Sequence, residues 1–148
     1  MSIVMIRGPE DPDPERSGAI PDAVYKTLSR CAADAGKALM IYSCGSEEEL
    51  VERLRQTRRD NADIVLLDPG RCAQASERLR DALAQLQVQY IEVHDDRYGA
   101  MDPVIPSGNG PRAAVVNGYA AQSYVLAMWI ALERIGCADC ANDIHVGT

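Results

Sequence analysis

The sequence predicts one α/β domain in which a five-stranded parallel sheet lies between two layers of helices. Five short runs rich in apolar and β-branched residues recur along the chain, segments with helical periodicity separate them, and each run ends in a polar or glycine-containing turn. This alternation is typical of parallel sheets joined by right-handed crossovers. The runs are residues 3–6, 38–42, 64–67, 90–93 and 113–116.

Helical periodicity occurs in four segments between and after these strands. In the first, Val24, Leu28 and Cys31 fall on one face, and in the second Ser46 and Glu49 have the spacing of a capping box. The last segment is apolar on most sides, as expected for a helix covered by other helices or by a second subunit. We therefore expect a homo-oligomer. The four segments are residues 22–33, 47–58, 76–86 and 120–135.

The stretch between the fourth and fifth strands, residues 97–111, interrupts this rhythm. It contains six glycine and proline residues, which exclude a normal helix. We expect it to form a loop over the carboxyl ends of the strands, in a three-layer sandwich with flavodoxin-like strand order. The chain then divides into one domain, residues 1–136, and a C-terminal tail, residues 137–148.

Composition narrows the classes of partner. The 148 residues suffice for one domain with a core of its own, 47% of them are apolar, and the formal charge is -7. Such a charge repels phosphate backbones, and no segment has the length of a membrane span or the pattern of a signal peptide. We expect a cytoplasmic protein with a small-molecule ligand, no nucleic-acid or membrane partner, and no cofactor.

The metal-binding residue types do not form a convincing site in the sequence. The five cysteines are expected to be reduced thiols, because a chain of this length needs no disulfide. Cys137 and Cys140 have the spacing of a metal or redox pair, but they supply two of the four ligands of a structural zinc. Asp95 and Asp96 beside His94 offer donors that a divalent cation accepts, yet adjacent acids at a strand end are common. No metal site is predicted.

The carboxyl ends of parallel strands share the edge at which ligands bind. Asp68, at the end of the third strand, would suit the phosphoacceptor of a receiver domain, but Arg7-Gly8 and Asn117-Gly118 stand where receivers need an acidic pair and a lysine. The turn Gly8-Pro9-Glu10 lacks the GxGxxG spacing of a dinucleotide site. Flavin binding stays open, although no aromatic-rich loop supports it.

Several motifs occur together and in one order. Leu79-Arg-Asp-Ala-Leu-Ala precedes Ile91-Glu-Val-His94. Support comes from the turns Gly8-Pro9 and Asp68-Pro69-Gly70 and from a helix start in residues 118–124. In these features, which span most of residues 3–135, the chain resembles the type II 3-dehydroquinate dehydratases. Their LRDAL, IEVH, NGPN, NPG and GxGxQGY-like motifs are the ones matched. Members of that family are flavodoxin-like enzymes of the shikimate pathway that usually assemble as dodecamers.

The resemblance implies a reaction in which a proton leaves the carbon beside a ketone and a hydroxyl leaves as water. His94 matches the histidine that protonates the departing oxygen, and Glu92 matches the glutamate that supports it. The family's tyrosine base is missing, because Ser17-Gly18 occupies its place, while Arg16 stands near the arginine that activates it. Glu10 replaces the asparagine that steadies the enolate. The catalytic residues implied are therefore His94, Glu92, Glu10 and Arg16.

The resemblance also implies a set of substrate-binding residues. Asp68 replaces an asparagine and Gln74 replaces a histidine, and residues 97–101 replace the arginines that grip the substrate. The full set is Asp68, Gly70, Gln74, Asp81, Asp95 and Asp96.

The replacements add negative charge to the expected cleft. Carboxylates a few ångströms apart interact by roughly a few kcal/mol in a partly desolvated cleft, enough to reverse a preference between anions and cations. We therefore expect a neutral or cationic cyclic substrate, or a bound metal ion, in place of 3-dehydroquinate. The acids involved are Glu10, Asp11, Asp13, Asp68, Asp95 and Asp96.

Three functions remain open from the sequence. The first is a dehydratase-like carbon–oxygen lyase with His94 as proton donor and Glu10 or Asp68 as base. The second is a catalytically inactive family member that serves as an oligomeric binding or scaffold protein, a trimer or a dodecamer. The third is an authentic 3-dehydroquinate dehydratase in which Arg16 and Tyr98 take over the missing roles.

Overall fold

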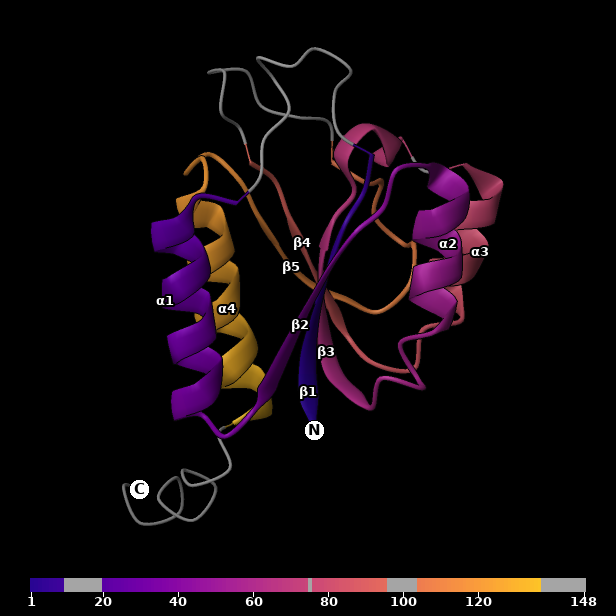
Figure 1. The fold of residues 1–148 in the computed structure, drawn as a ribbon. Helices are drawn as coiled ribbons and strands as arrows, with labels where there is room; N and C mark the ends of the chain where they lie inside the picture. Colours follow the sequence, from indigo (N-terminus) through magenta and orange to yellow (C-terminus); the bar gives the residue numbers. More distant parts are fainter. Residues whose placement is uncertain (10–19, 75, 96–103, 137–148) are drawn as a thin grey trace.

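The computed structural model describes residues 1–9, 20–74, 76–95 and 104–136. Five strands form one parallel sheet in the order β2-β1-β3-β4-β5, which confirms the predicted flavodoxin-like order (Figure 1). Each expected strand is present, with ends that differ by up to two residues. The strands are β1 (Ser2–Arg7), β2 (Ala38–Ser43), β3 (Ala62–Asp68), β4 (Tyr90–Val93) and β5 (Arg112–Val116).

Helices cover both faces of the sheet, and the predicted three-layer sandwich is confirmed. Helices α1 and α4 pack together on one face, and α2 and α3 pack together on the other (Figure 1). The second helix ends three residues earlier than predicted, because residues 56–60 turn away as a loop. The helices are α1 (Asp22–Asp34), α2 (Glu47–Arg55), α3 (Glu77–Ala84) and α4 (Gln122–Ile135), with a 3₁₀ turn at Gly70–Cys72.

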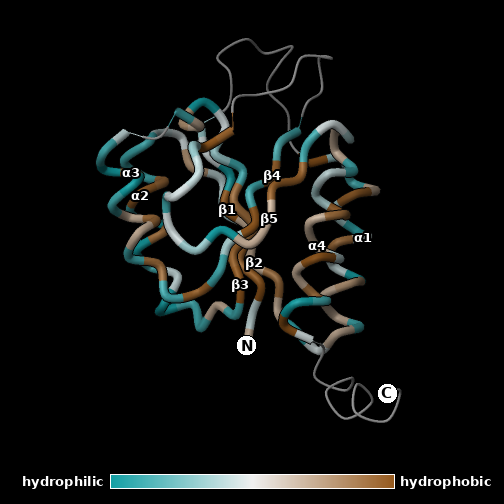
Figure 2. The backbone as a smooth tube through the Cα atoms, turned by 180° about the vertical axis from the view of Figure 1, so that it is seen from behind, coloured by the Kyte–Doolittle hydropathy of each residue, from teal (hydrophilic) through white to brown (hydrophobic). Residues whose placement is uncertain are grey.

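Alternating side chains of β1 divide the interior into two cores. Ile3 and Met5 pack with α1 and α4, whereas Val4 and Ile6 pack with α2 and α3. Figure 2 shows the hydrophobic residues concentrated along the central strands. Each fully buried aliphatic side chain contributes roughly 1.5–3 kcal/mol of transfer free energy, so these two cores stabilise the strands whose carboxyl ends form the site.

Helix caps agree with the sequence in part. Ser46 caps α2 as predicted, with its hydroxyl accepting from the backbone N–H of Glu49 at 3.2 Å. The carboxylate of Glu49 accepts from the backbone N–H of Gly45 at 2.9 Å, one residue before the position a capping box requires.

The turns after β1 and β3 are in backbone contact. The N–H of Gly8 donates to the carbonyl of Asp68 at 2.7 Å, and the N–H of Arg71 donates to the carbonyl of Pro9 at 3.1 Å. A Cβ at Gly8 would lie 2.3 Å from the carbonyl oxygen of Pro69, and one at Gly70, where φ is +56°, would lie 2.3 Å from that of Pro9. Glycine is therefore required at both positions, and the two turns are held as one unit.

The cysteines of the described ranges are reduced. Cys31, Cys44 and Cys72 are free, and burial raises the pKa of the Cys44 and Cys72 thiols. The pair Cys137 and Cys140 lies outside the described residues. Within the described ranges, no helix is both long enough and apolar enough to cross a membrane.

Candidate functional site

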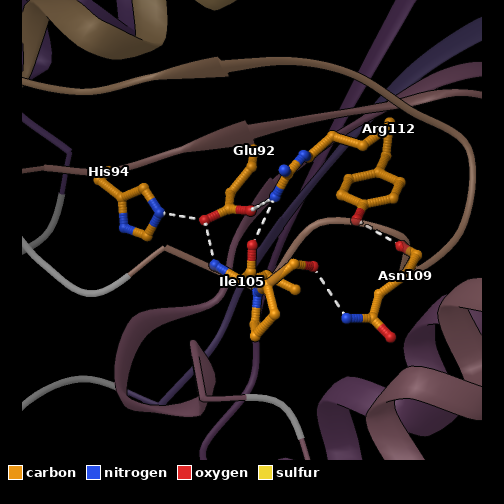
Figure 3. Close-up of polar contacts among 7 residues, drawn as sticks. Glu92, His94, Ile105, Asn109 and Arg112 are labelled. Carbon is orange, nitrogen blue, oxygen red and sulfur yellow. Dashed lines mark hydrogen bonds and ion pairs between the residues drawn. The ribbon is translucent and has the colours of Figure 1, made fainter.

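The carboxylate of Glu92 organises the end of β4. Glu92 and His94 are both fully buried, and the Nε2 atom of His94 contacts the Oε2 atom of Glu92 (Figure 3). The same oxygen accepts from the backbone N–H of Ile105 at 2.9 Å, and Oε1 accepts from the guanidinium of Arg112 at 2.9 Å. Three donor groups from three segments therefore converge on one carboxylate.

Arg112 ties the segment before β5 to this carboxylate. Its Nη1 atom also donates to the carbonyl of Ile105 at 2.7 Å, so one guanidinium bridges strand β4 and that segment (Figure 3). Nearby, the hydroxyl of Tyr90 donates to the carbonyl of Asn109 at 2.7 Å. Burial raises the pKa of Tyr90 to about 12, which keeps this hydroxyl protonated as a donor.

The chemical consequence concerns the imidazole of His94. A buried carboxylate beside a histidine fixes the orientation of the ring and stabilises the positive charge that the ring carries when protonated. The carboxylate itself is tolerated in the interior because Arg112 compensates its charge and two further donors satisfy its oxygens. This is the arrangement of a histidine prepared for proton transfer.

A second buried cluster joins the ends of β1 and β3 to α4. Arg7 and Asp68 are register partners on adjacent strands. The hydroxyl of Tyr124 donates to the Oδ2 atom of Asp68 at 2.5 Å and accepts from the Nε atom of Arg7 at 3.4 Å. The other carboxylate oxygen of Asp68 accepts from the backbone N–H of Gly70 at 3.0 Å.

Tyr124 is a proton donor in this cluster. Its side chain is fully buried, and desolvation, followed by the negative charge of Asp68, raises its pKa far above the ordinary value. The phenol is therefore neutral and holds its proton toward Asp68. Asp68 keeps lone pairs beyond these two hydrogen bonds, so it remains able to accept a further proton.

The two clusters lie at the carboxyl ends of neighbouring strands, on opposite faces of the sheet: Glu92 is on the α2–α3 side with Tyr90, and Asp68 is on the α4 side with Tyr124. Leu67 of β3 is the register partner of Glu92 of β4, which places Asp68 next to Val93 and one residue short of His94. The structure thus brings Asp68, Glu92 and His94 to one edge, as the sequence predicts, together with Gly70 and Asp95.

The other predicted site residues are not part of this group. Gln74 is exposed in the turn after the 3₁₀ segment, and Asp81 is exposed on α3, in the outer helical layer. Glu10, Arg16 and Asp96 lie outside the described residues, as do Ser17-Gly18 and Tyr98.

Sequence reasoning missed Arg7, Tyr124 and Arg112 as parts of the site. Arg7 stands in the turn identified as polar, but its charge was not weighed against the acids. The pairing of Tyr124 with Asp68 spans 56 positions along the chain and leaves no periodic signal. Arg112 had one available signal, since a charged residue opens an otherwise apolar strand.

The expected acidic cleft is only partly observed. Of its six acids, Asp68 and Asp95 belong to the described residues, and the other four, Glu10, Asp11, Asp13 and Asp96, lie outside them. Among the described residues, no group of three histidine, cysteine or acidic side chains is placed to hold a metal ion.

Comparison with known proteins gives a consistent result. Residues 13–132 match the family model described as dehydroquinase class II. A 3-dehydroquinate dehydratase of Stenotrophomonas maltophilia is 32% identical over 117 residues, which cover 78% of each chain. The corresponding enzyme of Hahella chejuensis is 28% identical over 142 residues, covering 90% of this chain and 97% of that protein.

Solved structures show the same fold. The type II dehydroquinase of Propionibacterium acnes superposes with a TM-score of 0.69 at 23% identity, covering 88% of this chain and 97% of that chain. A 3-dehydroquinate dehydratase-like protein from Bifidobacterium longum superposes with a TM-score of 0.64 at 19% identity, covering 90% and 97% of the two chains.

Proposed function

Because this chain belongs to the dehydroquinase class II family, we propose that it is a carbon–oxygen lyase that eliminates water from a small cyclic hydroxy ketone. The observation that carries the proposal is the buried assembly of Glu92, His94 and Arg112 at the end of β4. A histidine held this way by a carboxylate serves proton transfer more readily than binding alone.

The proposed reaction divides between the two clusters. Asp68 takes the proton from the carbon beside the ketone, and the electron pair of that C–H bond moves toward the carbonyl. As the enolate collapses, the electron pair forms the new C=C bond and the C–O bond breaks. The departing oxygen takes a proton from His94 and leaves as water. Tyr124 and the N–H of Gly70 hold Asp68 in place for the first step.

We further propose that the substrate is neutral or cationic. In the sequence, Asp95 and Asp96 directly follow His94, and Glu10 directly follows Gly8-Pro9 in the turn after β1. A second carboxylate brought into this region would be repelled. The proposed preference rests on the acids of the expected cleft together: Glu10, Asp11, Asp13, Asp68, Asp95 and Asp96.

One observation favours the alternative of an authentic 3-dehydroquinate dehydratase with a relocated base. Tyr124 and Arg7 form a tyrosine–arginine contact at 3.4 Å, as the family chemistry requires of its base. The raised pKa of Tyr124 argues against it, because a phenol that holds its proton this firmly is a poor base. The remaining alternative, an inactive binding or scaffold protein, would make the buried Glu92–His94 pair purely structural.

An assay with two matched ligands tests the proposal. Purified protein is mixed with 3-dehydroquinate and, separately, with its neutral carboxamide, and the ultraviolet absorbance of the conjugated product is followed. We expect turnover of the carboxamide with the higher kcat/KM, and loss of that turnover in His94→Ala. Preferred turnover of 3-dehydroquinate would contradict the substrate class. No turnover of either compound by folded protein would contradict the lyase and favour the binding role.

A further inference from the structure

Arg112 places a positive charge next to the buried pair of Glu92 and His94. It begins β5 as the register partner of Tyr90, which stands two residues before Glu92 on β4, and its guanidinium extends along the sheet toward that carboxylate (Figure 3). The side chain of Arg112 is 20% exposed, whereas those of Glu92 and His94 are fully buried. The charge is therefore largely desolvated, and water screens its effect on the pair only weakly.

The segment before β5 fixes the position of this guanidinium. The backbone N–H of Arg112 donates to the carbonyl of Gly110 at 2.9 Å. Gly110 has a φ of +81°, and a Cβ at this residue would lie 2.4 Å from the carbonyl oxygen of Leu83 in α3. The backbone that leads into Arg112 is thus packed closely against α3. From there the Nη1 atom of Arg112 binds both Glu92 and the carbonyl of Ile105.

The two oxygens of the Glu92 carboxylate have different partners. Oε1 accepts from Arg112 at 2.9 Å. Oε2 contacts the Nε2 atom of His94 and accepts from the backbone N–H of Ile105 at 2.9 Å. Because the guanidinium occupies Oε1, it determines which oxygen the carboxylate presents to the imidazole. Arg112 therefore acts on the orientation of His94 through Glu92.

The two charges act on the imidazole in opposite directions. The carboxylate of Glu92 stabilises the protonated ring, and in a desolvated interior a carboxylate alone would hold that proton tightly. The guanidinium of Arg112 repels the same positive charge, so it favours release of the proton. A general acid works best when it gives up its proton near the pH at which the enzyme operates. Together the two groups orient the ring without an excessive affinity for its proton.

Other ionisable groups lie around this end of β4. Burial raises the pKa of Tyr90 to about 12, and it also raises the pKa of the Cys72 thiol in the same core, so both groups are neutral near pH 7. Asp95 directly follows His94 in the chain, and Asp68 lies on the opposite face of the sheet. Helices α2 and α3 contribute apolar side chains to the core on the side of Tyr90. These groups are unchanged in every variant described below, so they do not account for a difference between the variants.

We infer that Arg112 is a positioning residue that sets the acid strength of His94. It binds the carboxylate that orients the imidazole, and its charge lowers the affinity of the ring for the proton that the departing oxygen receives. The inference rests on the proposed function, in which that proton comes from His94. Without the cation, the buried carboxylate keeps the ring protonated to a higher pH, and protonation of the leaving oxygen becomes slower.

The titration of the His94 ring tests the effect of the charge. The chain has two histidines, so a protein that carries His145→Gln and ¹³C-labelled histidine gives one ring signal, that of His94. NMR follows this signal against pH in the His145→Gln background, alone and with Arg112→Met or Arg112→Lys. We expect Arg112→Met to move the midpoint of the titration up by about one pH unit or more, the usual effect of a nearby charge, and Arg112→Lys to leave it near the starting value. A midpoint that does not rise in folded Arg112→Met, or that rises equally in both variants, would overturn the inference.

A second pair of variants applies if Arg112→Met does not fold. Glu92→Gln and the double variant Glu92→Gln with Arg112→Met differ by the same cation, and neither contains an unpaired buried carboxylate. We expect the double variant to have the higher midpoint for His94. Equal midpoints would overturn the inference.

The pH profile of turnover separates this inference from the proposed function. It is measured on whichever of the two matched ligands the wild type converts. The limb of kcat that follows His94 should move to higher pH in Arg112→Met, together with the midpoint from NMR, and Arg112→Lys should restore it. A shifted midpoint without any turnover would contradict the lyase and still support control of the imidazole by Arg112. Turnover with a limb that does not follow the midpoint would overturn this inference alone.

Discussion

The end of β4 and the adjoining ends of β1 and β3 each bury a carboxylate, and each stabilises it with a different set of partners. In each, a buried carboxylate has an arginine nearby: Glu92 binds Arg112 directly at 2.9 Å, whereas Asp68 binds the Tyr124 hydroxyl, which in turn accepts from Arg7 at 3.4 Å. At β4 the carboxylate holds an imidazole, a group that can donate or accept a proton. At β1 and β3 it holds a phenol whose raised pKa keeps its proton in place.

The two clusters also differ in how closely they match the motifs of the resembled family. The β4 end contains the IEVH motif unchanged, and its carboxylate, imidazole and guanidinium form one closed set of contacts. At the other end Asp68 stands where the resembled motif has asparagine. The Tyr124 hydroxyl binds its oxygen and itself accepts from Arg7. A charge introduced into a buried edge persists only with such partners. In the proposed mechanism, the β4 end protonates the leaving group and Asp68 at the end of β3 deprotonates the substrate.

The largest expected effect is the loss of turnover on removing the imidazole. His94→Ala should lower kcat by about 10²–10⁴-fold on whichever of the two matched ligands the wild type converts, the usual contribution of a general acid. Steady-state kinetics with circular dichroism as the control for folding measures it. A decrease smaller than tenfold would show that the β4 end is structural.

Next in size is the stability that depends on Arg112. Arg112→Met leaves the Glu92 carboxylate buried without its cation and should lower the free energy of unfolding by about 3–5 kcal/mol, measured by urea denaturation. The double variant Arg112→Met with Glu92→Gln is the matched control, because it removes the charge together with its partner. Equal losses of unfolding free energy in the single and double variants would show that the Arg112–Glu92 ion pair does not stabilise the fold.

Removal of the phenol hydroxyl should have a smaller effect. Tyr124→Phe leaves one oxygen of Asp68 without its donor and should cost about 1–3 kcal/mol in the free energy of unfolding. Adding Asp68→Asn to Tyr124→Phe should recover part of that loss, since an amide bears no charge to be solvated. A Tyr124→Phe protein as stable as wild type would contradict the role assigned to this hydrogen bond.

The smallest effect is confined to alkaline pH. Burial raises the pKa of Tyr90 to about 12 from the ordinary value of 10.0, so the folded protein holds a proton that the unfolded chain releases. The resulting stability is complete below pH 10 and is lost between pH 10 and about 12, with a slope approaching 1.4 kcal/mol per pH unit. Tyr90→Phe should flatten this decline in urea titrations across that range. An identical decline in both proteins would contradict it.

The sequence predicts the fold well because the fold depends on local signals. Alternation of apolar strands and periodic helices determines the layers, and right-handed crossovers then leave few strand orders. The signals for the capping serine of α2 and for the non-helical segment 104–111, the described part of the predicted loop, were equally local. The helix ends were less certain, since the extent of α2 depends on where residues 56–60 turn to meet β3.

The site was only half predictable for a related reason. Glu92 and His94 lie two residues apart and carry a motif, so they could be identified together. Tyr124 reaches Asp68 only because α4 packs across β3, and Arg7 matters only because its register partner is an acid. Such pairings arise from the tertiary fold, and the sequence alone does not show which of these distant residues are in contact.

Proton exchange in heavy water tests the division of labour between the two clusters most directly. Wild type, His94→Ala and Asp68→Asn are each incubated in D₂O with 3-dehydroquinate and with its neutral carboxamide. Proton NMR then follows both the C–H beside the ketone and the appearance of product. We expect His94→Ala to exchange this hydrogen without releasing water, and Asp68→Asn to do neither. Exchange that survives in Asp68→Asn, or that disappears in His94→Ala, would contradict the assignment of the base to β3 and the acid to β4.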